Sequence, residues 1–146
     1  MTWILVGSLA LLLTPAAAPE HQEVTLTGMV RSLSDVLKDR ELPADPEPIA
    51  DQVVLEQGDG TIAPLLSDEA SRALFQDKRL RGRKAEIRAW RYPGLPYLRV
   101  VSFRVEDQGT LRTPEYYCDV CTIHVRYPQP CPCCQGEMEL RMISQD

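Results

Sequence analysis

The stretch Arg83-Lys84-Ala85-Glu86-Ile87-Arg88-Ala89-Trp90-Arg91 decides the fold class, because small or apolar side chains alternate in it with long, mostly charged ones. A period of two places Ala85, Ile87 and Ala89 on one face of a β-strand. The sequence therefore predicts a strand with a buried inner face and a basic outer face.

The residues before this strand predict further β-structure. Glu23–Val30 alternates in the same way and predicts a first strand with Val24, Leu26 and Val30 on its inner face. Residues 31–52 break the pattern and form an acidic, proline-rich loop, in which Ser34 is expected to cap a single helical turn.

A hairpin and a short helix are predicted between these two strands. Residues 53–66 contain two apolar runs around Gly58-Asp59-Gly60, which favours a hairpin whose second arm, with Pro64, lies at an edge or ends early. Ser67, Asp68 and Glu69 are typical of a helix start, and the helix is expected to end near Asp77.

After the basic strand, Pro93-Gly94 turns the chain and Tyr97–Val105 predicts another strand. Its alternation places Val101, Phe103 and Val105 in the core and Arg99 at the rim. The fold class expected from these elements is mainly β with one short helix.

The order of these elements over residues 23–106 resembles the five-stranded OB barrel, in which a helix lies between the third and fourth strands. The resemblance rests on that order and on Leu80–Lys84 leading into the fourth strand. It implies a scaffold, or a surface for oligonucleotides or oligosaccharides. Another small β-barrel or a β-sandwich fragment is the alternative.

Two pairs of cysteines follow residues 107–115, which are predicted to be a linker. Cys118 and Cys121 form one C-x-x-C pair, and Cys131 and Cys134 form another after nine intervening residues. Four thiolates on two facing turns supply the tetrahedral shell that zinc prefers, so these four are the predicted metal ligands. Residues 116–142 resemble a zinc ribbon, or the paired knuckles of rubredoxin-like domains, which implies a carboxyl-terminal hairpin with strands at 122–126 and 137–141.

The match has two irregularities. Knuckles of this kind usually place glycine directly after the second cysteine, where Thr122 and Gln135 stand here, so the local turns are expected to differ. Cys133 is an additional sulfur and the candidate reactive thiol, and it could also form a C-x-C pair with Cys131. Two disulfides, or an iron ion in the same four sulfurs, remain open alternatives to zinc.

Residues 1–18 are predicted to be a signal peptide, because the apolar run Trp3–Leu13 is followed by the small residues Ala16-Ala17-Ala18. The expected location is therefore extracytoplasmic, either periplasmic or secreted, and an uncleaved amino-terminal membrane anchor is the alternative. No later segment has the length of about 20 apolar residues that a transmembrane helix needs.

Charge is unevenly distributed in a chain whose net charge is −5. Residues 72–104 hold ten bases and two acids, so this segment is a candidate surface for an anionic polymer or a protein. Alternatively, these arginines pair with the acidic part of the chain. The candidate residues for polyanion binding are Arg83, Lys84, Arg88, Trp90 and Arg91.

No catalytic motif is recognisable in a chain with only two histidines, His21 and His124. The sequence therefore predicts a non-enzymatic, exported binding or scaffold module with one structural zinc. Two alternatives stay open: metal handling or electron transfer at the cysteines, and nucleic-acid or polyanion binding on the basic strand face.

Overall fold

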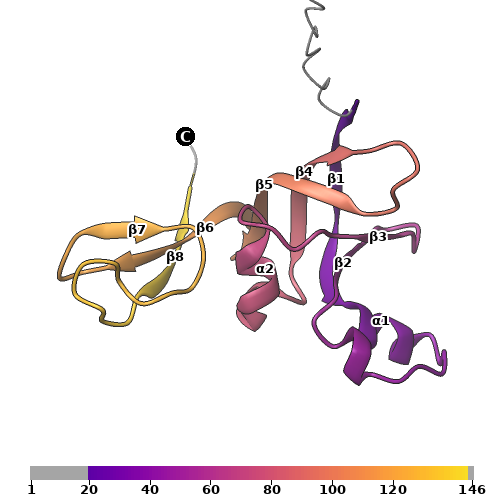
Figure 1. The fold of residues 1–146 in the computed structure, drawn as a ribbon, viewed down its shortest axis with the longest axis horizontal. Helices are drawn as coiled ribbons and strands as arrows, with labels where there is room; N and C mark the ends of the chain where they lie inside the picture. The colour runs from indigo at the N-terminus through magenta and orange to yellow at the C-terminus, as the bar shows by residue number, and fades with distance from the viewer. Residues whose placement is uncertain (1–19, 145–146) are drawn as a thin grey trace, which may run out of the picture.

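A computed structural model describes residues 20–144, so the predicted signal peptide, residues 1–18, lies outside the described residues. The described chain is mainly β, as predicted, with eight strands in one antiparallel sheet (Figure 1). The strands are β1 (Gln22–Ser32), β2 (Val53–Glu56), β3 (Ile62–Pro64), β4 (Lys84–Arg91), β5 (Leu98–Asp107), β6 (Thr110–Cys118), β7 (Ile123–Val125) and β8 (Glu139–Ile143).

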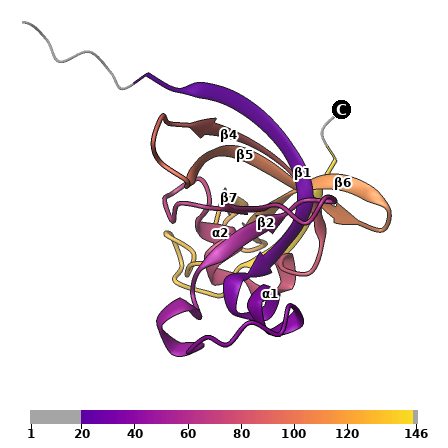
Figure 2. The ribbon, with the colours of Figure 1, turned by 90° about the vertical axis from the view of Figure 1, so that its right-hand side faces the viewer.

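The strand order is β3-β2-β1-β4-β5-β6-β7, and β8 pairs with β6. The long, curved β1 lies between β2 and β4 and pairs with both (Figure 2). Gly28 is required where β1 meets β2, because a Cβ there would lie 2.4 Å from the carbonyl oxygen of Glu56. A parallel bridge between Leu65 and Leu98 joins the end of β3 to the start of β5, so the β1–β5 sheet curves back on itself.

The core fills the inside of this curved sheet. Ala85, Ile87 and Ala89 are buried, which confirms the inner face predicted for β4. On β1, Val30 is buried while Val24 and Leu26 are half-buried against the core. The other large side chains buried there are Val53, Leu55, Leu65, Leu74, Leu80, Leu98, Val100, Val105 and Tyr116.

Strand β5 differs from its prediction in one place. Val105 is buried and Phe103 packs half-buried against the core, but Val101 lies outside it and Leu98 and Val100 are buried instead. The register of β4 and β5 shifts at Arg88, which leaves Val101 as an extra residue. Such a bulge reverses which residues face inward, so the alternation holds only on each side of it.

Both α-helices begin at a different residue from the one predicted. Helix α1 (Leu33–Asp39) is capped by Ser32, not Ser34, because the Ser32 hydroxyl accepts a hydrogen bond from the backbone of Asp35. Helix α2 (Arg72–Gln76) starts after Ser71, whose hydroxyl donates to the carbonyl of Leu66 at 2.6 Å and closes a turn where the helix start was expected. The 3-10 turns η1 (Glu47–Ile49) and η2 (Lys78–Leu80) complete the elements.

Residues 107–115, predicted to be a linker, form a tight turn and most of strand β6. Gln108 and Gly109 both have positive φ in that turn, and the start of β6 pairs with β5. Farther on, the same strand pairs with β7 and β8, so one continuous strand carries the chain from the β1–β5 sheet into the cysteine module, residues 116–144 (Figure 1). None of the described helices has the length and apolarity needed to cross a membrane.

Candidate metal centre

Four cysteines converge at one end of the cysteine module. Cys118 is the last residue of β6 and Cys121 lies in the turn before β7, while Cys131 and Cys134 lie in a second turn before β8. Their four sulfur atoms all lie within 4.8 Å of one another. The structure therefore brings together the four residues whose spacing predicted a site, and they could hold a metal ion.

The sulfur positions fit a small tetrahedral ion. Four sulfurs at about 2.3 Å from a central zinc are about 3.8 Å from each other. The Sγ atoms of Cys118 and Cys134 are 3.6 Å apart, and all five cysteines are free thiols. Cys118 and Cys131 are buried while Cys134 is exposed, so the cluster sits at the surface with two of its sulfurs covered by protein.

The two turns that carry the cysteines resemble each other, although neither has glycine directly after its second cysteine. Thr122 donates its backbone N–H to the carbonyl of Cys118 at 2.8 Å, and Gln135 donates to Cys131 at 2.9 Å. Thr122 and Gln135 also have matching φ angles of 56° and 61°, in the left-handed region that favours glycine. The geometry of each turn is thus retained with a non-glycine residue at the strained position.

Hydrogen bonds within the cluster separate the thiols by acidity. The backbone N–H groups of Cys134 and Cys133 lower the pKa of the Cys131 thiol to about 7. Hydrogen bonds with the Cys133 and Cys134 thiols, together with burial, raise the pKa of Cys121. At Cys118 the backbone N–H of Cys121 lowers the pKa, but burial and the neighbouring thiols raise it by more. A metal ion must therefore displace protons to bind here.

The fifth cysteine and the nearby histidine lie outside the four-sulfur group. Cys133 is exposed, and its thiol is a hydrogen-bond neighbour of Cys121. Arg126, which follows β7, lines a groove beside β5. His124 is exposed on β7, opposite Tyr117 of β6, and is not part of the cluster.

A buried contact fastens the cysteine cluster to the β1–β5 part of the protein. Tyr116, two residues before Cys118, donates its hydroxyl to Asp77 at 2.7 Å, and both side chains are buried. Burial raises the pKa of Asp77, but hydrogen bonds from Arg79 and Tyr116 outweigh it and hold the pKa below its usual value. No local sequence pattern indicates this pair, because its members are 39 residues apart and belong to different elements.

Ring contacts hold the rest of the module in place. The Arg72 guanidinium of α2 lies 4.3 Å from the centre of the Tyr127 ring, and that of Arg141 on β8 lies 3.7 Å from the centre of the Tyr117 ring. Arg141 also pairs with Asp119 in the first cysteine turn. These contacts tie the first cysteine turn to β8 and the segment after β7 to α2.

Of the residues predicted to bind polyanions, three share the outer face of β4, and the other two lie before the strand and on its opposite face. Arg83 donates to the carbonyl of Glu106 and pairs with Asp107. Trp90 packs against His21 and lies under the Arg99 guanidinium. Arg91 lies near the turn at Tyr92–Pro96, on the face of β4 opposite Arg88. Lys84 and Arg88 are exposed on the outer face. Acidic partners on neighbouring strands thus neutralise part of the basic segment.

Comparison of the chain with protein-family models, with curated proteins and with solved structures finds no match in any of the three. The description of the fold and of the four-cysteine site therefore rests on the geometry of this structure alone.

Proposed function

We propose that this protein is an exported, non-enzymatic binding or scaffold module whose carboxyl-terminal part is folded by one structural zinc ion. The supporting observation is the convergence of the sulfurs of Cys118, Cys121, Cys131 and Cys134 within 4.8 Å. Four protein thiolates leave no open coordination position, which is the arrangement of a structural site and not of a catalytic one.

The chemistry of the ligands favours zinc. A set of four thiolates selects zinc or iron, and zinc brings no redox chemistry of its own. The two matching turns hold the sulfurs at separations close to those of a tetrahedral zinc shell. When bound, the ion would cross-link β6 to the second cysteine turn.

The β1–β5 part would supply the scaffold, and we propose that it is an OB-like barrel. Its support is the pairing of β1 with both β2 and β4, the helix between β3 and β4, and the bridge between Leu65 and Leu98 that joins the two ends of the sheet. Export is supported by the apolar run at residues 3–13. Amino-terminal sequencing tests export: a mature start between residues 17 and 19 supports it, and an intact Met1 contradicts it.

Metal analysis of the purified full chain tests the zinc centre. We expect one zinc per chain in the wild type and in Cys133→Ser, and a loss of most of the zinc in Cys131→Ser, because only the latter removes a ligand. The two substitutions are matched, since both replace a cysteine of the same turn by serine.

Three results would contradict this assignment. Oxidised disulfides without metal would favour a covalent module, and iron in place of zinc would favour electron transfer. Loss of zinc in Cys133→Ser but not in Cys131→Ser would show that the ligand set includes the additional sulfur.

A further inference from the structure

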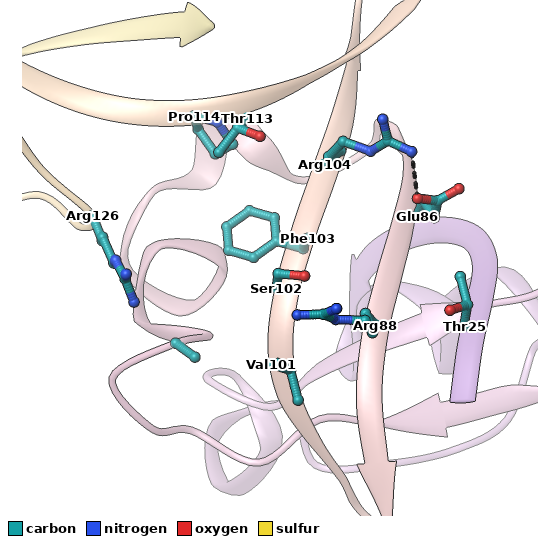
Figure 3. Close-up of a pocket in the computed structure, with 11 residues that line it drawn as sticks. Thr25, Glu86, Arg88, Val101, Ser102, Phe103, Arg104, Thr113, Pro114 and Arg126 are labelled. Atoms are coloured by element: carbon teal, nitrogen blue, oxygen red, sulfur yellow. Dashed lines mark hydrogen bonds and ion pairs between the residues drawn. The ribbon is translucent and has the colours of Figure 1, made fainter. Parts of the chain in front are cut away.

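Strand β6 diverges from β5 and opens a groove between them. The two strands pair through residues 105–107 of β5 and 110–112 of β6, after which β6 continues into the cysteine module. The space left between them, about 680 Å³, is bounded by β5 on one side and by Thr113, Pro114 and Arg126 on the other (Figure 3). This volume is in the usual range for binding sites.

The wall on the β5 side is an unpaired strand edge. Among the described residues, 99–104 of β5 have a strand neighbour on one side only, which is β4. Four consecutive residues line the groove: Val101, Ser102, Phe103 and Arg104. Successive side chains of a strand point to opposite faces of the sheet. Four consecutive residues can therefore line the same groove only where the edge of their strand faces that groove.

The groove also holds two cations, of which Arg88 makes a single long ion pair and Arg126 makes none among the described residues. The carboxylate nearest to Arg88 is that of Glu23, at 3.7 Å between exposed side chains, and Arg126 makes no ion pair within residues 20–144. Arg104, by contrast, is held by Glu86 at 2.6 Å. Figure 3 shows Arg88 directed across β5 toward the side on which Arg126 lies. A chain of net charge −5 thus places one unpaired guanidinium group and one that is only loosely paired in the same groove.

We propose that this groove binds an extended acidic peptide, which adds as a strand to the free edge of β5. The backbone of residues 101–104 would supply hydrogen bonds, and Arg88 and Arg126 would each receive a carboxylate. The half-buried Phe103 and Val101 provide apolar contact for the side chains between the acids. Strand addition also covers backbone groups that an open edge otherwise leaves exposed.

A peptide fits the groove better than a nucleic acid does. Single-stranded nucleic acid needs exposed aromatic faces for stacking and a continuous basic track. The one aromatic ring in the groove, Phe103, packs against the core, and Glu86 interrupts the track of cations. An unpaired strand edge, in contrast, is specific for another extended backbone.

The proposal rests on the proposed function only through Arg126, whose position depends on a folded cysteine module. The test titrates a fluorescent Glu-Val-Glu-Val-Glu-Val peptide into the full chain at low salt and follows its anisotropy. We expect Arg126→Gln to weaken binding about tenfold. Arg91→Gln, which removes the same charge from an exposed residue outside the groove, should change it by less than about twofold.

Two further probes separate strand addition from charge attraction. A peptide with alternate backbone nitrogens methylated keeps its charge but loses hydrogen-bond donors, and it should bind at least about tenfold more weakly. Hydrogen exchange of the amides of residues 101–104 should slow in the complex. The proposal would be overturned by equal losses of affinity in Arg126→Gln and Arg91→Gln. Full binding of the methylated peptide, or tighter binding of an oligothymidylate than of the peptide, would also overturn it.

Zinc content and circular dichroism of each sample keep the two proposals apart. A zinc-free protein would contradict the proposed function alone. In that zinc-free protein the same titration would still test whether the groove binds the peptide, because β4 and β5 do not contain the metal ligands. Arg88→Gln would then replace Arg126→Gln as the test variant.

Discussion

Thr122 and Gln135 occupy equivalent left-handed positions, one after each pair of cysteines. A side chain with a Cβ costs about 1–2 kcal/mol in this conformation, and the β-branched threonine is the less suited of the two. The folded protein keeps this unfavourable conformation because the backbone N–H of each residue donates to a cysteine carbonyl and closes the turn. Relief of this strain should therefore stabilise the module.

Thr122→Gly is expected to raise the free energy of unfolding by about 0.5–1 kcal/mol, since glycine removes the steric cost but adds entropy to the unfolded chain. Urea denaturation of the metal-loaded protein measures the change. Thr110→Gly is the matched control, because Thr110 is exposed on β6 without a positive φ, and it should lower the stability. A loss of stability in both variants would argue against strain at residue 122.

Metal affinity should depend steeply on pH. The raised pKa values of Cys118 and Cys121 keep both thiols protonated in the metal-free protein well above neutral pH, and Cys131 gains a proton as the pH falls through about 7. Acid therefore favours the metal-free form, and affinity should fall steadily from pH 9 to pH 6. Competition with a chromophoric chelator should show at least about two protons released per ion above neutrality. A flat profile would contradict the thiol assignment.

The residues of the metal site were predictable because the constraint is local. Each C-x-x-C pair places two sulfurs on one turn, so the spacing alone identifies Cys118, Cys121, Cys131 and Cys134. The shared geometry of the turns was not predictable from glycine positions, because Thr122 and Gln135 adopt positive φ against their preference. Tertiary contacts and turn hydrogen bonds overrule local propensity at these two residues.

Among the strands, β6 connects the cysteine cluster to the β1–β5 sheet. Its buried residues, Pro114, Tyr116 and Cys118, lie on one face, and the hydroxyl of Tyr116 reaches Asp77 just after α2. Since the Asp77 carboxylate also caps η2 and its backbone N–H caps the end of α2, a single residue joins three elements. The orientation of the cysteine module should depend on this contact.

Tyr116→Phe is expected to cost about 1–3 kcal/mol in the free energy of unfolding, because a buried carboxylate loses a donor. Tyr117→Phe is the control, since it keeps the ring that Arg141 covers, and it should change stability little. The pKa of Asp77 is depressed in the folded protein, so its contribution is present above the usual carboxyl pKa and is lost as the pH falls through the folded value. Urea denaturation near pH 7 and near pH 3 should show a smaller difference between wild type and Tyr116→Phe in acid.

Regular alternation made β4 predictable, and its interruption explains what was missed in β5. Every second residue of β4 is small or apolar, and the structure buries Ala85, Ile87 and Ala89. In β5 the adjacent Val100 and Val101 fit either face equally well, so the pattern does not show where the bulge lies. Ser71 is a similar case, because its hydroxyl closes a turn through a contact with Leu66 that local sequence does not encode.

For the whole molecule, burial is concentrated in the β1–β5 sheet. Within residues 116–144, the buried side chains are Tyr116, Cys118 and Cys131 only, two of which are candidate ligands. Other apolar side chains of this segment, such as Leu140 and Met142, are only half-buried against the main core. A segment of this size with so little buried apolar surface needs a metal or another cross-link to hold its structure. Loss of the metal should therefore unfold the module selectively.

Chelation under reducing conditions is expected to speed hydrogen exchange in β7 and β8 while the central strands β1 and β4 stay protected. The measurement is hydrogen–deuterium exchange with peptide-level mass spectrometry, before and after removal of the metal. Reloading zinc should restore protection, and Cys133→Ser should behave as the wild type. Uniform unfolding of the whole chain would show that the sheet does not fold independently of the metal.

The groove could not be predicted from the sequence, because its walls come from segments far apart in the chain. Arg88 lies on β4 and Arg126 follows β7, and no local pattern relates them. The basic segment was visible as composition, but its neutralisation by acids such as Asp107 and Glu86 depends on strand pairing. Which charges remain available is a property of the assembled molecule.

The proposed zinc ion would be enclosed by four cysteine sulfurs. X-ray absorption spectroscopy at the zinc edge, on the full chain purified under reducing conditions, measures this coordination shell. We expect four sulfur neighbours at about 2.3 Å, both in the wild type and in Cys133→Ser. A first shell in which nitrogen or oxygen replaces two or more sulfurs, or a protein without zinc whose cysteines are paired as disulfides, would contradict it.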